Sequence, residues 1–321
     1  MTLADYLERY VESLHLKKTQ TQISYTNNIK RVRRYPIGSI KLKDLTKTIC
    51  REYISNLIND YADSTVKGQH NFIKQAIRHG IDEEYLETNP FDFPIKKMLS
   101  GKVIRPAIAL TDKEFDSLIN EMQSSSVYRF YIPHLVLLRE TGLRISEFCA
   151  LTDDDVDFEN RMLRINKQIG ESLDHKQDFI DTPKTESSNS YVPLTSVAID
   201  AIRSIMSYTT IRQSLLNQDQ TELTEGMFVL SKRHKSMNRN SWDHIFKNIT
   251  KFYNKKHSES ELVVRPHTLR HTTATRLLEK GLSVPSTQKM LRHSSPQTTL
   301  SLYTHFTANT LQAELDKLSM D

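Results

Sequence analysis

Hydrophobic residues recur at helical spacing through the first 90 residues of the chain. Two such stripes consist of Leu3, Leu7, Tyr10, Val11 and Leu14, and of Ile49, Tyr53, Ile54, Leu57 and Ile58. This spacing places each stripe on one face of a helix, which must be buried. A further helix is expected from Ser64, as its N-cap, to His79, because the following Gly80 is a typical terminator. The pattern predicts several amphipathic helices, ended by Asn89-Pro90.

A polar, basic and glycine-containing segment over residues 96–106 separates these helices from a second pattern, and we interpret it as an interdomain linker. Beyond it, Thr111 followed by Glu114 has the spacing of a capping box, which predicts the start of a helix. The chain therefore divides into a helical domain over 1–95, the linker, and a second domain over 107–305.

Helical patterns open and close the second domain. A mostly apolar helix is expected from Pro133 to Glu140, with Gly142 at its end. Later helices are expected from Trp242 to Phe252 and from Pro266 to Lys280. The last of these has proline at a suitable first position and Gly281 after its end.

Between these helices the periodicity changes to short β-type runs. Val156 to Phe158 and Met162 to Ile165 flank one polar turn, and Phe179 to Thr182 and Ser190 to Leu194 flank a second. Such runs around a polar turn predict hairpins. We therefore expect a mainly α protein with a small β-sheet, in which a helical bundle precedes a mixed α+β domain.

Composition limits the class of protein. A length of 321 residues suits two domains, and 37% hydrophobic with 26% charged residues is typical of a soluble globular protein. Cys50 and Cys149 lie far apart among apolar neighbours, so we expect buried thiols in a reducing cytoplasm. No signal pattern is present and no run approaches the roughly 18 apolar residues that span a bilayer, so we expect no membrane insertion.

Positive charge is concentrated in the N-terminal part. The net charge of +5 and the pI near 9.0 favour a polyanionic partner. Residues 1–100 hold 16 Lys and Arg against 12 Asp and Glu, a net of +4, which leaves +1 for the rest. A solvated helix face would explain the run at 30–34, but phosphate contacts are the sharper hypothesis. The candidates are Lys30, Arg31, Arg33, Arg34, Lys96, Lys97, Lys102 and Arg105.

Six residues of the second domain stand in an order and in local contexts that chance does not explain. They are Arg144, Lys184, His267, Arg270, His293 and Tyr303. Arg144 lies in Thr-Gly-Leu-Arg-Ile-Ser-Glu at 141–147, His267 and Arg270 form a His-x-x-Arg pair, and Tyr303 follows His293 by ten residues. The set resembles the catalytic residues of the tyrosine recombinases, the phage-integrase family. The resemblance is close over 105–321 and looser over 1–95.

The resemblance implies a helical-bundle core-binding domain, a catalytic domain of the tyrosine-recombinase type, and a clamp around double-stranded DNA. It is strongest toward integrases of conjugative transposons and phages, which cut and rejoin DNA for integration and excision through a 3′-phosphotyrosine without ATP. Such integrases often carry a small upstream domain that binds arm sites. The core-binding pattern here begins at Leu3, so we expect that this chain lacks that domain, naturally or by truncation.

The reaction explains why these residue types are needed. A phosphodiester gains a second negative charge in its transition state, and a guanidinium offers a planar, always protonated fork for two oxygens. Arg144 and Arg270 would fill that role, and Arg144 stands near a helix start, where the backbone also favours an anion. Tyr303, with an ordinary pKa of about 10, needs a base, for which His267 is the candidate.

The family assigns the remaining two roles. The resemblance makes Lys184, in the second polar turn, the general acid that protonates the departing 5′ oxygen. It makes His293 a hydrogen-bond donor to a non-bridging oxygen. No metal or cofactor is expected, since arginines supply the positive charge. His267 and His271 have the i, i+4 spacing of a zinc protease, but Thr268 occupies the place of its glutamate.

Three positions stay open. Glu147 could orient a catalytic histidine or simply cap its helix. Relatives usually have glycine before the second histidine, whereas this chain has Arg292, which could contact DNA or project into solvent. Ser190 stands where relatives often have arginine.

The C-terminal residues 306–321 predict a partner. Leu311, Leu315 and Leu318 form the stripe of a short amphipathic helix, which must be buried. In the family such a helix docks on a neighbouring protomer, which implies a dimer on each site and a tetramer in synapsis; docking on its own chain is the alternative. An excisionase or a host DNA-bending protein is a further expected partner.

Other functions also stay open. A chromosome-dimer-resolving recombinase is the nearest alternative, and a type IB topoisomerase-like nicking and closing enzyme would share the tyrosine chemistry. A catalytically silent DNA-binding regulator normally loses the arginine or the tyrosine, and a structural protein has no need for the full set.

Overall fold

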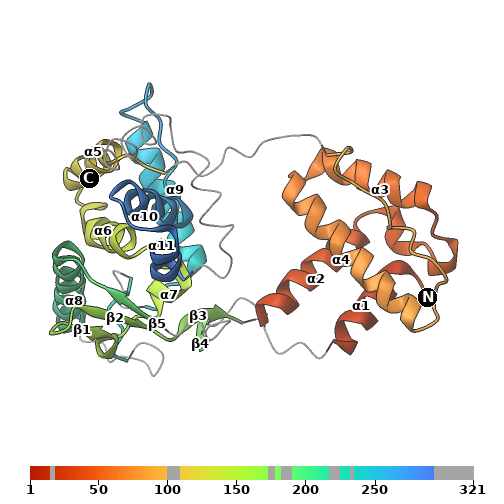
Figure 1. The fold of residues 1–321 in the computed structure, drawn as a ribbon, viewed down its shortest axis with the longest axis horizontal. Coiled ribbons are helices and arrows are strands. Elements are labelled where there is room, and N and C mark those ends of the chain that lie inside the picture. Colours follow the sequence, from red (N-terminus) through yellow and green to blue (C-terminus); the bar gives the residue numbers. More distant parts are fainter. Residues whose placement is uncertain are drawn as a thin grey trace, which may run out of the picture. The chain divides into compact units, whose positions relative to one another are not determined.

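The structure is a computed structural model, and it describes residues 1–14, 19–99, 109–172, 178–181, 190–216, 225–231 and 235–292. The chain forms two compact units, Met1–Pro106 with Glu171–Lys176, and Ala107–Gly170 with Gln177–Asp321. Figure 1 shows a helical first unit and a second unit in which helices accompany short strands. The predicted fold class, mainly α with a small β-sheet, is confirmed. No helix of the described residues is long and apolar enough to cross a membrane.

Among the residues that the structure describes, the first unit has four helices around one core. They are α1 (Leu3–Ser13), α2 (Thr19–Arg33), α3 (Lys47–Asp60) and α4 (Asp63–Asp82), with 3-10 turns at η1 (Pro36–Ser39) and η2 (Leu42–Asp44). The predicted stripes supply much of the core: Leu3, Leu7, Ile54 and Leu57 are fully buried. The amphipathic pattern therefore identified which faces pack together.

Helix α4 differs from its prediction at both ends. It begins after Ala62 rather than Ser64 and continues through Gly80 to Asp82. A Cβ at Gly80 would lie 2.7 Å from the hydroxyl oxygen of Tyr6, which donates to the main-chain oxygen of Ala76 at 2.6 Å. Gly80 therefore admits a buried tyrosine against the helix rather than ending it.

The second unit contains the remaining helices and all the strands described. The helices are α5 (Asp112–Gln123), α6 (Ile132–Thr141), α7 (Ile145–Cys149), α8 (Ser196–Leu216), α9 (Arg239–Asn254), α10 (Pro266–Glu279) and α11 (Val284–Leu291), with 3-10 turns η3 (Arg129–Tyr131) and η4 (Asp153–Asp155). The predicted capping box opens α5, because Thr111 Oγ1 accepts the Glu114 N–H and a Glu114 oxygen accepts the Thr111 N–H. That prediction is confirmed.

The strands form two small sheets. They are β1 (Val156–Asp157), β2 (Met162–Ile165), β3 (Gln168–Glu171), β4 (Asp178–Asp181) and β5 (Ser190–Pro193). The first predicted hairpin is confirmed as the antiparallel pair β1 and β2. The second is wrong in its pairing, because β4 pairs with β3 while β5 pairs with β2. Val192 of β5 lies opposite Leu163 of β2 with both side chains buried, so the core selected a partner distant in sequence.

His134 of α6 lies inside an aromatic cluster of this core. Its ring centroid lies 5.4 Å from that of Trp242 and 6.2 Å from that of Phe148, and the residue is 1% exposed. Burial lowers the pKa of His134 to about 3. The imidazole is therefore neutral at physiological pH.

Stability is expected to fall on acidification because of this histidine. Its folded pKa lies below the unfolded value, so the unfolded chain binds the extra proton between about pH 3 and 6.5. Lowering the pH from 7 to 5 should cost about 2 kcal/mol of unfolding free energy through His134 alone. Urea titrations should show this part of the loss removed in His134→Leu and kept in His244→Gln, an exposed position on α9. An equal loss in the His134 variant would contradict the assignment.

Candidate active site

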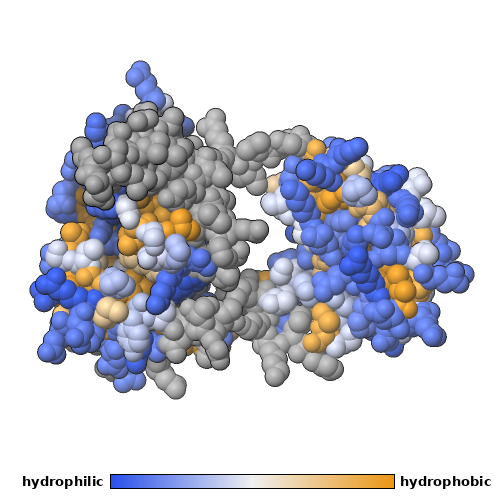
Figure 2. All heavy atoms as spheres, viewed as in Figure 1, coloured by the Kyte–Doolittle hydropathy of each residue, from blue (hydrophilic) through white to orange (hydrophobic). Residues whose placement is uncertain are grey.

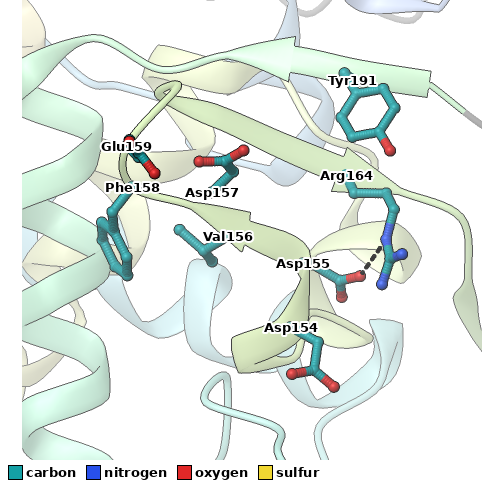
Figure 3. Close-up of a pocket in the computed structure, with 8 residues that line it drawn as sticks. All are labelled: Asp154, Asp155, Val156, Asp157, Phe158, Glu159, Arg164 and Tyr191. Carbon is teal, nitrogen blue, oxygen red and sulfur yellow. Dashed lines mark hydrogen bonds and ion pairs between the residues drawn. The ribbon is translucent and has the colours of Figure 1, made fainter.

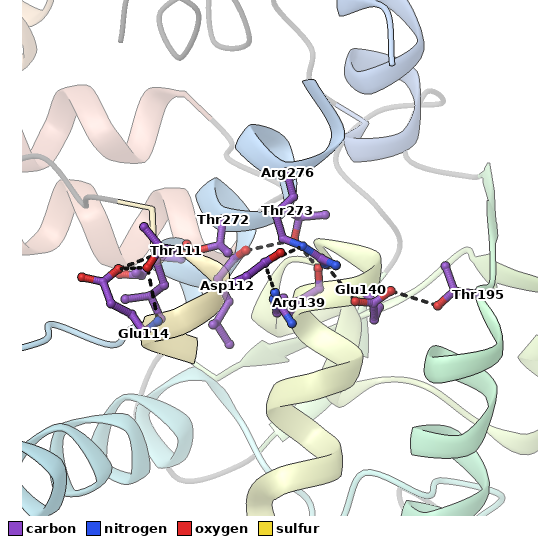
Figure 4. Close-up of polar contacts among 12 residues, drawn as sticks. Thr111, Asp112, Glu114, Arg139, Glu140, Thr195, Thr272, Thr273 and Arg276 are labelled. Atoms are coloured by element: carbon purple, nitrogen blue, oxygen red, sulfur yellow. Dashed lines mark hydrogen bonds and ion pairs between the residues drawn. The ribbon is translucent and has the colours of Figure 1, made fainter. Parts of the chain in front are cut away.

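Helix α10 carries two candidate catalytic residues and is fixed against its neighbours by a polar network (Figure 4). Arg276 Nη1 donates to Glu140 of α6 at 2.8 Å, and Arg276 Nε lies 3.2 Å from a carboxylate oxygen of Asp112 on α5. Thr273 Oγ1 donates to the main-chain oxygen of Arg139 at 2.7 Å. Since these contacts hold the middle of α10 against α5 and α6, they fix the rotation of its N-terminal turns.

A left-handed turn at Gly142 joins α6 to α7. Gly142 has φ of 59°, and a Cβ there would lie 2.4 Å from Leu291 Cδ2. Glycine therefore provides both the backbone conformation and the space into which the end of α11 packs. The turn places Arg144, the N-cap residue of α7, beside the end of α11.

Arg270 of α10 bridges this turn. Its Nη1 donates to the main-chain oxygen of Gly142 at 2.6 Å, and its Nη2 donates to that of Leu291. Burial and then the positive charges of Arg144 and Arg292 lower the pKa of Arg270, although a guanidinium stays protonated at neutral pH. Three guanidiniums near one another favour the binding of an anion.

Arg144 is held by a carboxylate and a main-chain oxygen. Its Nη1 donates to Glu147 Oε1 at 2.7 Å, and its Nη2 donates to the oxygen of Arg292 at 2.9 Å. Glu147 Oε2 also accepts the Arg144 N–H at 3.0 Å, so Glu147 caps α7 and orients the arginine. Burial opposes ionisation of Glu147, but the charges of Arg292 and Arg144 leave its pKa below the usual value.

Arg292 is buried, which differs from what the sequence predicted. The sequence left it as a DNA contact or a solvent-facing residue, but its side chain is 1% exposed and its Nη2 donates to Glu147 Oε2 at 2.6 Å. The residue ends α11 in the left-handed conformation, which turns the side chain toward α7. A buried, paired guanidinium cannot reach DNA in this arrangement.

His267 lies on the first turn of α10, three residues before Arg270. It is exposed, yet desolvation by surrounding protein atoms is the largest cause of its lowered pKa, followed by the charges of Arg239 and Arg270. A neutral imidazole at physiological pH can accept a proton. The pKa of His271 is also lowered, mainly by burial. Among the described residues, no group of three His, Cys, Asp or Glu side chains is arranged to hold a metal ion.

The structure thus brings together Arg144 and Arg270 and places His267 on the same helix as Arg270. Lys184, His293 and Tyr303 lie outside the described residues, as do Lys102, Arg105 and the C-terminal segment 306–321. Their roles stay predictions. His293 directly follows the last described residue, Arg292, so the chain leads from the arginine cluster into the segment that contains it.

The basic residues of the first unit differ in their surroundings. Arg31 donates to Asn28 and Gln69, and Arg33 forms an ion pair with Glu8 at 2.7 Å. Arg34 donates to the Tyr61 hydroxyl at 3.2 Å. Three lysines, Lys30, Lys96 and Lys97, are exposed. The face of this unit seen in Figure 2 is mostly hydrophilic.

A polar groove between α2 and α4 was not singled out from the sequence. Its polar lining includes Ser24, Asn28, Thr65, Asn71 and Gln75, and Arg31, Tyr25 and Phe72 also line it. Asn71 and Gln75 are exposed at i, i+4 spacing, and this pair of amides in the sequence could have indicated the groove. Amide side chains on one helix face can donate to and accept from base edges.

A shallow pocket beside β1, β2 and β5 is acidic (Figure 3). Asp154, Asp157 and Glu159 contribute acidic groups, and Asp155 is buried and paired with Arg164 at 3.3 Å and with Lys167 at 2.5 Å. Acidic groups repel phosphates. Arg164 and Tyr191 also line the pocket, so it is an acidic pocket with one cation, and its carboxylates disfavour a phosphate.

Comparisons with known proteins show what the two parts of the chain are similar to. Residues 109–310 match the phage integrase family, and residues 2–98 match the phage integrase SAM-like domain. The chain is 26% identical over 309 residues to the transposase from transposon Tn916 of Enterococcus faecalis, covering 95% of this chain and 74% of that protein. It is 23% identical to the integrase of Staphylococcus phage L54a, covering 98% and 92%.

A solved structure is similar over the whole length. The Tn1549 transposon integrase in complex with transposon right end DNA has a TM-score of 0.88 and 26% identity, covering 99% of this chain and 100% of that one. The family match over residues 109–310, more than half of the chain, shows that this chain belongs to the phage integrase family, the tyrosine recombinases.

Proposed function

We propose that this protein is the site-specific DNA recombinase of a mobile element, and that it cuts and rejoins strands through a 3′-phosphotyrosine on Tyr303. The proposal rests on the position of two arginines. Arg144 and Arg270 both donate to main-chain oxygens at the end of α11, and Arg270 also donates to that of Gly142. The similarity to transposon and phage integrases supports the biological role.

The two arginines supply the charge that the reaction requires. Attack on a phosphodiester builds a second negative charge on the non-bridging oxygens, and donors already fixed in place stabilise it without reorganisation. Arg144, with 36% of its side chain exposed, presents its guanidinium to the scissile phosphate. Arg270, buried behind the Gly142 turn, provides the second cation.

Proton transfers complete the cycle. The Tyr303 hydroxyl oxygen attacks phosphorus and its proton passes to neutral His267, while the bond to the 5′ oxygen breaks and that oxygen takes a proton from Lys184. His293 donates a hydrogen bond to a non-bridging oxygen. The phosphotyrosine keeps one phosphoester bond for each bond broken, so a 5′ hydroxyl of another strand can reverse the step without ATP.

Double-stranded DNA is the proposed partner. The exposed Lys30, Lys96 and Lys97 and the polar groove between α2 and α4 give the first unit groups for phosphates and bases. Loss of one phosphate contact should lower the slope of the logarithm of the DNA-binding constant against the logarithm of salt concentration by about one. Equilibrium binding at several salt concentrations measures this slope.

We propose a dimer on each site and a tetramer in synapsis, linked through the C-terminal segment 306–321.

A suicide DNA substrate, nicked near the crossover, tests the proposed reaction. Wild-type protein is expected to form a covalent adduct, because loss of the short cleaved fragment prevents religation. Tyr303→Phe should form none while binding the same DNA, since only the hydroxyl is removed. Electrophoresis under denaturing conditions measures the adduct, and Tyr208→Phe, a substitution at an exposed tyrosine of α8, is the control. An adduct that persists in Tyr303→Phe would refute the assignment.

A further inference from the structure

Arg144, Glu147 and Arg292 form a closed ring of polar contacts. Arg144 Nη1 donates to Glu147 Oε1 at 2.7 Å, and Glu147 Oε2 accepts from Arg292 Nη2 at 2.6 Å. The main-chain oxygen of Arg292 closes the ring by accepting from Arg144 Nη2 at 2.9 Å. Arg292 therefore contacts Arg144 directly through its backbone and indirectly through Glu147.

The backbone of Arg292 makes this double contact possible. Its φ of 56° and ψ of 44° lie in the left-handed region, which favours glycine and is strained for residues that carry a Cβ atom. The Glu147 pair holds an arginine at this position despite that strain. Because the same residue ends α11, the ring also ties the end of this helix to the start of α7.

Exposure separates the roles of the three residues. The side chains of Arg292 and Glu147 are 1% and 5% exposed, whereas that of Arg144 is 36% exposed. Only Arg144 in this ring can reach a phosphate from solvent. The two buried members can act on the reaction only by setting the direction of the Arg144 guanidinium.

We propose that Arg292 is a positioning residue, whose guanidinium holds Glu147 so that Glu147 holds Arg144 toward the scissile phosphate. This inference rests on the proposed function. Removing the guanidinium leaves Glu147 with one fewer cation, so the carboxylate is more easily protonated. A neutral Glu147 grips Arg144 more weakly.

Arg292→Gly is the direct test, since glycine suits the left-handed backbone and removes only the side chain. We expect about tenfold or greater loss of the single-turnover cleavage rate on the suicide substrate, because small displacements of positioned groups are costly. DNA affinity and its salt dependence should be unchanged. The loss should grow as the pH falls, since Glu147 protonates at a higher pH in the variant. Arg292→Lys should recover part of the rate, because it restores the cation without the planar fork.

Three outcomes would overturn the inference. One is a wild-type cleavage rate in folded Arg292→Gly, checked by thermal melting. Another is weaker DNA binding with a smaller salt slope, which would make Arg292 a DNA contact. If the glycine variant does not fold, Arg292→Asn decides the matter, because asparagine tolerates the left-handed backbone and carries no charge, and a rate equal to wild type there would be the third.

A structural readout separates this inference from the proposed function. In ¹⁵N NMR of arginine side chains, rotation of the Arg144 guanidinium should be slower in wild-type protein than in Arg292→Gly. If wild-type protein forms no adduct, the proposed function fails, and the NMR comparison still tests the ring. If the adduct forms and the Arg144 signals are equal in both proteins, the positioning role alone fails.

Discussion

Arg270→Lys is expected to lower the rate of DNA strand cleavage by about a hundredfold or more, a loss typical of removing one preorganised donor in an anion-stabilising site. Arg270 uses Nη1 and Nη2 to span the main-chain oxygens of Gly142 and Leu291. A lysine has a single ammonium on a flexible stem, so it cannot hold both oxygens and direct a further N–H at a phosphate.

The measurement is a single-turnover time course on the suicide substrate, with binding of the same DNA as a check. Arg276→Lys is the matched control, because Arg276 lies on the same helix and pairs with Asp112 and Glu140 at the opposite side of the network. A lysine there can still pair with these carboxylates and hold α10 in place, so the cleavage rate should fall much less than in Arg270→Lys. Equal losses in both variants would show that the effect comes from a disturbed helix rather than from a lost guanidinium at the phosphate.

Gly142→Ala is expected to reduce the free energy of unfolding by about 2–4 kcal/mol, the combined cost of a left-handed alanine and an overpacked core. The added methyl group would lie 2.4 Å from Leu291 Cδ2 and 3.2 Å from Thr273 Cγ2. Leu291 is fully buried, so it has little room to move. The turn that carries the Arg270 acceptor would shift, and cleavage should fall as well.

Gly281→Ala separates the cost of backbone strain from the cost of overpacking. Gly281 also has a positive φ, of 86°, but a Cβ there meets no described atom within 4 Å. Urea denaturation should therefore show a smaller loss in Gly281→Ala, from backbone strain alone, and normal cleavage. If both variants lost the same stability, close packing of α11 against the Gly142 turn would not be the reason that glycine is needed there.

Features that depend on neighbours in sequence were predictable. The capping box of Thr111 and Glu114 and the hairpin of β1 and β2 formed as expected, because their partners lie within a few residues. The helical stripes identified buried faces for the same reason. Contacts between distant segments were not predictable, and the pairing of β5 with β2 replaced the expected local hairpin. Gly80 carried the signal of a helix terminator but serves to admit Tyr6.

The candidate site divides in the same way. The sequence identified Arg144, His267 and Arg270 by their local contexts, and left Glu147 with two possible roles. Its contacts with Arg144 now favour capping and orientation of that arginine. Lys184, His293 and Tyr303 remain predictions from the sequence.

By itself, the sequence determined the family, the chemistry of the candidate groups and the helices that carry them, because residue type and short-range spacing encode these directly. Only the tertiary structure decided which charges meet. Arg292 reads as an exposed cation in the sequence, but the left-handed end of α11 and the packing at Gly142 bury it against Glu147. Burial and ion pairing of Arg292 depend on a segment nearly 150 residues away in the sequence, and no local pattern shows that the two segments come into contact.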